Sequence, residues 1–377
     1  MGAVFRRSCT TRSSSGAAAT RNRPAPPSPM RGARLSSAAD PLCGMTEAYL
    51  DRFAYVPDRQ ALRRSTARQV TQPYVLWLCH STSRGNAMSG TPNSPSPDLR
   101  YEVFVSDMVP AASPPAPDGG PSQWSSLSHT LIYGPSEALL TDPPITRGQA
   151  DALIQWLEGR QVPLRYIYLT HGHADHYLTT NYLLHRFPEA TVVATEETLS
   201  RISRETPYGQ ISDRYINFFG DALPEPPVTV SGTAFPDAGL ELDGQALFAH
   251  KVGHSDTDDT SVLHAPSLDL VVAGDVVYNN VHQYVGEGRD GGLDAWHRAL
   301  DIVADLRPRS VVASHKDTRR SDSPSDIDET RRYLEAAAAV LDKASDATQF
   351  FNALKEQYPD RVNPWAIWLS ARRLFPN

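Results

Sequence analysis

Four side chains that can bind metal ions stand within six consecutive residues of this sequence. The segment Thr170–His176 reads THGHADH, in which His171, His173, Asp175 and His176 supply three imidazoles and one carboxylate. His171 and His173 can reach one metal ion, while Asp175 and His176 can reach a second ion close by. Such donors suit zinc first, with iron and manganese as alternatives. The segment therefore predicts a metal centre, whereas the simpler interpretation is a surface run of histidines.

Three further metal-capable residues each follow a short apolar run. His254 follows Val252–Gly253, Asp275 ends Val271–Asp275, and His315 ends Val311–His315. Taken singly, each would more often be an ordinary core residue than a ligand. Their shared position at strand ends, in the order His, Asp, His after the first cluster, favours a common site.

Together these segments resemble the ligand pattern of the metallo-β-lactamase superfamily. The resemblance implies that His254 gives the third nitrogen to the first metal. It also implies that Asp275 bridges both metals and that His315 binds the second. Ser314 stands where the family usually has glycine, a departure that leaves the neighbouring ligand in place. Asp142, at the end of an earlier strand, matches the acid that supports the metal loop in this family, although it could be an ordinary turn aspartate.

The resemblance covers about residues 101–320 and implies an α+β fold, a four-layered αββα sandwich with the metals at one edge. We expect two Zn²⁺ ions, with Fe or Mn as alternatives. The implied activity is that of a binuclear hydrolase cleaving a small acyl substrate, such as a thioester, a lactone or a related ester or amide. A metal-bridging hydroxide would be the nucleophile, and Asp175 would orient its proton.

The full ligand set resembles glyoxalase II and lactonases more than true β-lactamases. The best-known β-lactamase subclass has cysteine at the position of Asp275, so antibiotic hydrolysis is disfavoured. The alternative function is that of an oxidoreductase resembling persulfide dioxygenase, with one iron. Tyr278, Asn279 and His282 follow the bridging aspartate and are candidates to hydrogen-bond the substrate, unless they only pack against the C-terminal helices.

Strands and helices that position these residues can be predicted from apolar periodicity. Thr146–Glu158 is predicted as a helix capped by Thr146. Three helices are expected after Asp326, at Ile327–Ala347, Ala347–Tyr358 and Trp365–Leu374, covering the active site or forming a dimer surface. The predicted strands are Tyr101–Val109, Leu127–Tyr133, Ala138–Thr141, Arg165–Leu169, Thr191–Ala194, Ala246–His250, Thr260–Ala265, Leu268–Ala273 and Ser310–Ala313.

Charge is distributed unevenly over the 377 residues, whose net charge is -7. The first hundred residues hold 14 Lys and Arg against 5 Asp and Glu, which leaves 22 against 38 for the remainder. An acidic main domain is a poor match for a phosphate backbone, so a nucleic-acid partner is not expected. No apolar run is long enough for a membrane span, so no membrane partner is expected either. The expected partner is a small-molecule substrate, with a homo-oligomer as an open alternative.

The N-terminal segment differs in composition from the rest. Residues 1–40 are rich in Arg and Ser and contain no acid before Asp40, which is typical of a transit peptide or of a dispensable leader. We therefore predict a disordered leader and linker at 1–99, a metallo-β-lactamase domain at 100–322 and a helical extension at 323–377. The expected location is cytoplasmic, or mitochondrial if the leader is a targeting signal. The three cysteines (Cys9, Cys43 and Cys79) all lie in this first segment, so the site chemistry must come from His and Asp.

Overall fold

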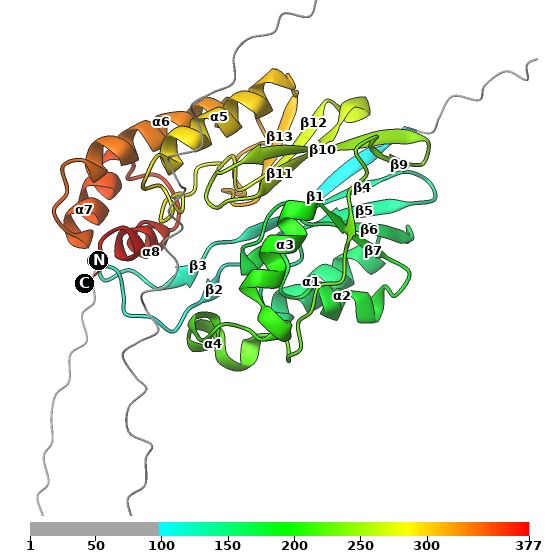
Figure 1. Ribbon diagram of the computed structural model, residues 1–377, viewed down its shortest axis with the longest axis horizontal. Helices are drawn as coiled ribbons and strands as arrows, with labels where there is room; N and C mark the ends of the chain where they lie inside the picture. Colours follow the sequence, from blue (N-terminus) through cyan, green and yellow to red (C-terminus); the bar gives the residue numbers. More distant parts are fainter. Residues whose placement is uncertain (1–97, 377) are drawn as a thin grey trace, which may run out of the picture. The chain divides into compact units, whose positions relative to one another are not determined.

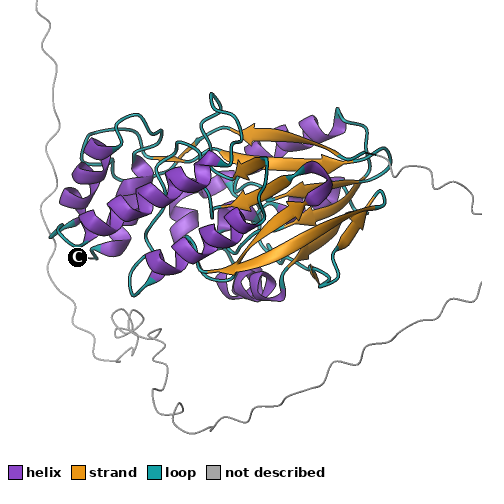
Figure 2. Ribbon diagram, turned by 90° about the horizontal axis from the view of Figure 1, so that it is seen from above, coloured by secondary structure: helices purple, strands orange, loops and turns teal. Residues whose placement is uncertain are grey.

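Two stacked β-sheets with helices on their outer faces form the part of the chain that the computed structural model describes, residues 98–376 (Figures 1 and 2). The first sheet has six strands in the order β1-β4-β5-β6-β7-β8. Its strands are β1 (Arg100–Ser106), β4 (Leu127–Tyr133), β5 (Ala138–Thr141), β6 (Leu164–Tyr168), β7 (Thr191–Ala194) and β8 (Thr233–Ala234). β1, β4 and β5 pair antiparallel, and β5 to β8 pair parallel.

The second sheet has five strands in the order β13-β12-β11-β10-β9. These are β9 (Leu240–Leu242), β10 (Gln245–Gly253), β11 (Thr260–Ala265), β12 (Leu270–Gly274) and β13 (Ser310–Ala313). Only β12 and β13 pair parallel, so both end at the same edge of the sheet. A separate ribbon pairs β2 (Val109–Pro110) with β3 (Gln123–Trp124).

Alternation along the strands explains the layered architecture. Successive side chains of a strand point to opposite faces, so a strand buried on both sides is apolar throughout. In β12, Val272 packs in the core between the sheets, whereas Val271 packs in the larger helix-lined core. Leu139 and Leu140 of β5 divide in the same way. The predicted αββα sandwich is therefore confirmed.

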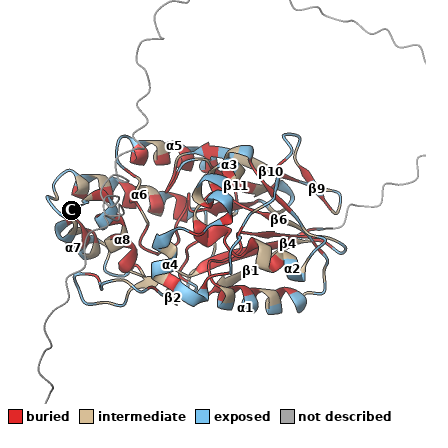
Figure 3. Ribbon diagram, turned by 60° about the horizontal axis from the view of Figure 1, so that its bottom comes forward, coloured by how far each residue is buried: buried red, intermediate tan, exposed pale blue. Residues whose placement is uncertain are grey.

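Helices cover the two outer faces (Figure 3). The helices are α1 (Arg147–Glu158), α2 (Thr180–Arg186), α3 (Glu196–Glu205), α4 (Asp213–Phe219), α5 (Gly292–Asp305), α6 (Ser325–Leu341), α7 (Ala347–Gln357) and α8 (Trp365–Leu374). α1 packs beside β1, and α5 packs beside β10 and α6. α8 contacts α7 and β3, which brings the C-terminal helices to one end of the sandwich.

Most predicted elements appear with small changes in their bounds. Thr146 caps α1 as predicted, and it does so through a capping box with Gln149. α6 ends at Leu341 instead of Ala347, because Asp346 caps the following helix by accepting a hydrogen bond from Gln349 N. α5, with Leu293, Trp296 and Leu300 on its buried face, was not predicted; it starts at two glycines, without a capping side chain.

Several predictions concern residues outside the described range. Apart from Asp98 and Leu99, the expected leader and linker lie there, as do the three cysteines. The domain boundary after residue 322 stays a prediction, since α6 to α8 share one apolar cluster with the sandwich. Within residues 98–376, no helix has the length and apolar character needed to cross a membrane.

Candidate metal centre

The histidine-rich loop leaves β6 and is held from behind by Asp142, which follows β5. Thr170 donates to Asp142 from both its backbone N and its Oγ1, each at 2.8 Å, and His176 Nδ1 lies 3.1 Å from Asp142 Oδ2. Because Thr170 Oγ1 donates to Asp142, it accepts from His171 Nδ1 at 3.0 Å. Both imidazoles thus carry their proton on Nδ1 and direct Nε2 away from this network. Asp142 supports the loop as the family resemblance implied.

Asp275 and His315 meet the loop because the parallel strands β12 and β13 end at the same edge. The left-handed backbone of Gly274 (φ +56°) brings the end of β12 so close to Thr170 that an added Cβ would lie 3.0 Å from its side chain. His315 Nδ1 donates to the Ser126 carbonyl oxygen at 2.7 Å, which leaves Nε2 free. That Nε2 lies 3.2 Å from Asp275 Oδ2 and 3.5 Å from Asp175 Oδ2.

The loop between β10 and β11 contributes Asp256 rather than His254. Asp256 Oδ2 lies 2.6 Å from His173 Nδ1 and 3.5 Å from His171 Nε2. His254 instead pairs through Nδ1 with Asp258 at 2.7 Å, and its Nε2 faces Gly292 at the start of α5. The prediction that His254 completes the first metal position therefore disagrees with the structure. The other six predicted ligands are brought together.

Buried donor atoms converge here without hydrogen-bond partners among the described residues: His171 Nε2, His176 Nε2, Asp256 Oδ2 and Asp275 Oδ1. They contribute to three groups whose ligand atoms lie within 4.8 Å of one another, namely His171/His173/Asp256, His171/His176/Asp275 and Asp175/His176/His315. Burial alone would lower the pKa of His176, yet Asp275 and Asp175 raise it to about 9. A site that holds a proton so tightly between carboxylates is electrostatically suited to a cation, so the residues fit a metal centre.

Comparison with known proteins gives the same assignment. A family model described as "Metallo-beta-lactamase superfamily" matches residues 126–315, which is half of the chain. The protein belongs to the metallo-β-lactamase superfamily. The matched range begins at Ser126, the carbonyl partner of His315, and ends at His315 itself.

Relatives among curated proteins are similar over part of their length. The chain is 30% identical over 184 residues to "Hydroxyacylglutathione hydrolase" of Parasynechococcus marenigrum (strain WH8102). It is 41% identical over 186 residues to the protein of the same name from Synechococcus sp. (strain CC9605). Each match covers 48% of this chain and 63% of the relative.

Among solved structures, the chain matches "Metallo-beta-lactamase from Pontibacter korlensis" at 18% identity and a TM-score of 0.46. That match covers 63% of this chain and 99% of the other. A metallo-β-lactamase from Hirschia baltica matches at 16% identity and a TM-score of 0.44, over 63% of this chain and 93% of the other.

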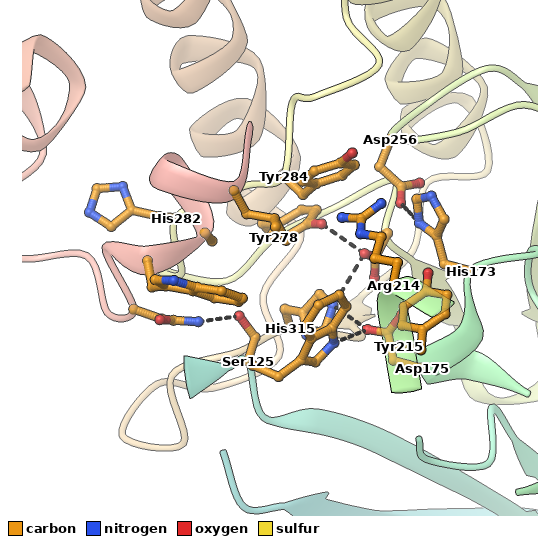
Figure 4. Close-up of a pocket in the computed structure, with 16 residues that line it drawn as sticks. Ser125, His173, Asp175, Arg214, Tyr215, Asp256, Tyr278, His282, Tyr284 and His315 are labelled. Carbon is orange, nitrogen blue, oxygen red and sulfur yellow. Dashed lines mark hydrogen bonds and ion pairs between the residues drawn. The ribbon is translucent and has the colours of Figure 1, made fainter. Parts of the chain in front are cut away.

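A cavity opens onto the cluster (Figure 4). Its walls come from β3, α4, the segment after β12, and α8. They are formed by Trp124, Ser125, Arg214, Tyr215, Tyr278, His282, Tyr284, Asn363, Trp365, Ala366 and Leu369. The rings of Tyr215 and Trp365 lie 6.1 and 6.0 Å from that of Trp124. Of the three C-terminal helices, α8 lines the cavity, through Trp365, Ala366 and Leu369.

The three candidate substrate contacts have different positions. Tyr278 lines the cavity and donates from its hydroxyl to Asp275 Oδ2 at 2.7 Å. His282 also lines it, at a distance from the cluster (Figure 4), with Nδ1 3.1 Å from the Tyr333 hydroxyl. Asn279 does not line it: its Nδ2 donates to the Ser321 carbonyl and its backbone N to the His315 carbonyl. Its predicted role in substrate binding is corrected to that of a structural residue.

Other cavity residues were missed by sequence reasoning. Trp124 donates from Nε1 to Asp175 Oδ2 at 2.8 Å, and Arg214 extends over the cavity from α4. Neither residue lies in a recognisable motif. Both are distant in sequence from the histidine-rich loop and come near it only in the folded structure. Asp256 follows His254 by two residues in the sequence, and only the structure shows which of the two side chains faces His171 and His173.

Proposed function

We propose that this protein is a metal-dependent hydrolase that cleaves a small acyl substrate, with a thioester as the first choice and a lactone or related ester as the next. The observation that carries this proposal is the set of unpartnered buried donors, of which Asp256 and Asp275 line the cavity. The relatives named hydroxyacylglutathione hydrolase, whose name describes thioester cleavage, support the substrate class.

Water is the nucleophile in this proposal, because no activated side-chain nucleophile lines the cavity among the described residues. Ser125 Oγ accepts a hydrogen bond from Asn363 Nδ2 at 2.7 Å, and no described histidine or carboxylate is hydrogen-bonded to it. When bound, divalent cations at the donors would polarise the substrate carbonyl and lower the pKa of a coordinated water towards neutrality.

Residues of the chain position the reacting groups. Asp175 accepts the proton of the attacking water, and the Trp124 indole holds Asp175 Oδ2 in place. The Tyr278 hydroxyl fixes the Asp275 carboxylate from the cavity side. Water adds to the acyl carbon, and collapse of the tetrahedral intermediate breaks the carbon–sulfur or carbon–oxygen bond. The proton taken up by Asp175 then passes to the leaving thiolate or alkoxide.

Arg214 adds a charge preference to the substrate class. Its guanidinium lines the cavity, and no carboxylate of the described residues lies within ion-pair distance of it. Desolvation opposes its charge, yet the polar side chains of Tyr215, Tyr284 and Glu287 raise the pKa of Arg214, so it stays protonated. The proposed substrate therefore carries a negative charge at the end remote from the scissile carbonyl.

The activity is tested with metal-loaded full-length protein on thioesters, lactones, β-lactams and phosphodiesters. We expect thioester or lactone turnover that Asp175→Asn lowers about 100-fold or more, since it removes a proton acceptor at the reacting atoms. Asp305→Asn, on the exposed face of α5, is the matched control and leaves turnover unchanged. Metal-loaded protein without turnover on any ester-like substrate would overturn the proposal.

The charge preference is tested by Arg214→Gln. KM for an anionic thioester should rise about tenfold, equivalent to ~1.4 kcal/mol, while KM for a neutral thioester of the same size stays within twofold. Arg372→Gln, an exposed change on α8, is the control. An equal rise in KM for both substrates would show that Arg214 does not select for a negatively charged substrate.

A second candidate function, an iron-dependent oxygenase of sulfur compounds, has one specific observation in its favour. His171, His173 and Asp256 form a two-histidine, one-carboxylate set, which is typical of non-haem iron oxygenases. Oxygen uptake by the iron-loaded protein with a glutathione persulfide, together with no hydrolysis of esters, would favour this function over the first.

A further inference from the structure

We propose that Asp256 is the third protein ligand of the metal held by His171 and His173, in place of a histidine. Asp256 is only 1% exposed, and its Oδ2 has no hydrogen-bond partner among the described residues. That oxygen lies 2.6 Å from His173 Nδ1 without hydrogen-bond geometry, and 3.5 Å from His171 Nε2. Three donor atoms that converge within 4.8 Å are arranged as ligands of one cation. Figure 4 shows the Asp256 carboxylate directed towards His173.

The loop backbone fixes the direction of Asp256. β10 ends at Gly253 with a left-handed backbone (φ +81°), and Ser255 N then donates to the Thr257 carbonyl at 2.9 Å. The Ser255 hydroxyl donates to Asp256 Oδ1 at 3.0 Å, so the other carboxylate oxygen is left to face His173. These contacts hold the carboxylate in its position before any ion binds.

The same loop directs His254 away from the cluster. His254 Nδ1 is engaged by Asp258, and its Nε2 lies so close to Gly292 that an added Cβ there would be 2.8 Å away. His254 is also absent from the cavity wall, to which Asp256 belongs. His254 Nε2 is also buried without a partner among the described residues, but it faces the start of α5 and not the cluster, so His254 serves as an internal control.

The donor set that results is richer in oxygen than one with five histidines. Four imidazoles (His171, His173, His176 and His315) share the centre with three carboxylates (Asp175, Asp256 and Asp275). Carboxylate ligands suit Mn²⁺, whereas imidazole suits Zn²⁺, so the affinity for Mn²⁺ relative to Zn²⁺ is raised at the Asp256 position. The inference concerns metal binding alone and stands whether or not the protein hydrolyses acyl substrates.

The test measures metal content of the full chain after stripping and reloading, by plasma mass spectrometry and by titration with Mn²⁺, Zn²⁺ and Co²⁺. Asp256→Ala should lose about one ion per chain and change the visible spectrum of the Co²⁺-loaded protein. His254→Ala should keep both the metal content and the spectrum of the wild type. Loss of metal in His254→Ala, or full retention in Asp256→Ala, would overturn the proposal.

A second variant covers the outcome that Asp256→Ala fails to fold. Asp256→His restores a nitrogen donor, and it should shift the ratio of Zn²⁺ to Mn²⁺ affinity at least tenfold towards Zn²⁺. An unchanged ratio in a variant whose circular dichroism matches the wild type would equally overturn the assignment. Because every readout is binding or spectroscopic, a failure of the proposed hydrolase activity would not produce these results.

Discussion

Buried polar atoms without partners among the described residues include two sets whose arrangement differs. In the metal cluster, His171 Nε2, His176 Nε2 and Asp256 Oδ2 point towards one another, within 4.8 Å of their group members. In the C-terminal helical layer, both oxygens of Asp326 and the indole nitrogens of Trp365 and Trp368 also lack partners among the described residues, but they form no metal-capable group.

Whether such atoms mark a binding site depends on how they are arranged. An unpaired buried polar atom lowers stability by about 1–3 kcal/mol wherever it lies. Where several such atoms converge and the loop that carries them is held by hydrogen bonds, as Asp142 holds this loop, binding of a cation restores the lost stability. Where the unpaired atoms are scattered, no single ion can bind them and the stability stays lowered. Convergence, rather than the absence of partners, therefore marks the site.

Metal removal should produce the largest effect of this comparison. If the ion is present at a thousand times its dissociation constant, its loss lowers the free energy of unfolding by about 4 kcal/mol. We expect the melting temperature of the protein to fall on chelation, measured by differential scanning calorimetry. His171→Ala, which removes a donor shared by two groups, should abolish the difference between the chelated and loaded protein. Identical melting temperatures of the wild type with and without chelator would contradict the claim that the converging donors bind a stabilising cation.

Replacing the brace behind the cluster comes next. Asp142→Ala removes the acceptor for Thr170 and His176, and the metal affinity should fall about 10- to 100-fold, as measured by competition with a chromophoric chelator. Asp243→Ala is the matched control, since Asp243 accepts from Ser136 and Glu137 at a turn remote from the cavity. It should lower stability and leave metal affinity intact. Equal losses of affinity in both would show a general effect on folding.

A smaller effect is expected when an indole that is hydrogen-bonded to the cluster is compared with one that is not. Trp124 Nε1 donates to Asp175, whereas Trp368 Nε1 is buried without a partner. Trp124→Phe should lower kcat about tenfold with little change in KM, because one hydrogen bond to the proton acceptor is lost. Trp368→Phe should leave kcat unchanged. A fall in kcat of similar size in both variants would contradict the role given to Trp124.

The smallest effect is expected at Asp326, and it depends on pH. Burial raises the pKa of Asp326 to about 6, although Arg320 opposes this from 3.8 Å. The unfolded state therefore loses its proton first as pH rises from about 4, and stability falls until about pH 6. Asp326→Asn should raise the free energy of unfolding by ~1 kcal/mol at pH 7.5 and leave it unchanged at pH 4, measured by urea unfolding.

The exposed Asp328, on the same turn of α6, provides the control for that experiment. Asp328→Asn should lower stability by a few tenths of a kcal/mol at pH 7.5, because an acid near a helix N-terminus is stabilising. A gain in stability from Asp326→Asn that persists at pH 4 would contradict the titration of this carboxyl group.

Sequence reasoning succeeded where a pattern is local and periodic. β4, β5, β11 and α8 have the predicted bounds, because alternating or continuous apolar runs fix them without reference to the rest of the chain. α5 carries an equally regular apolar face and was missed, since it starts at glycines in place of a capping residue. The cavity wall could not be found in this way, because Trp124, Arg214 and Trp365 are brought together only by the packing of β3, α4 and α8.

By itself, the sequence determined the donor chemistry of residues 171–176 and the strands that end beside them, because four adjacent ligands and short apolar runs have few other uses. Only the tertiary structure decided between His254 and Asp256. Side-chain direction in a loop has no period, and depends on one left-handed glycine, the Ser255 hydrogen bonds and the approach of α5. Contacts within the loop and from the distant helix α5 thus fixed what the order of residues left open.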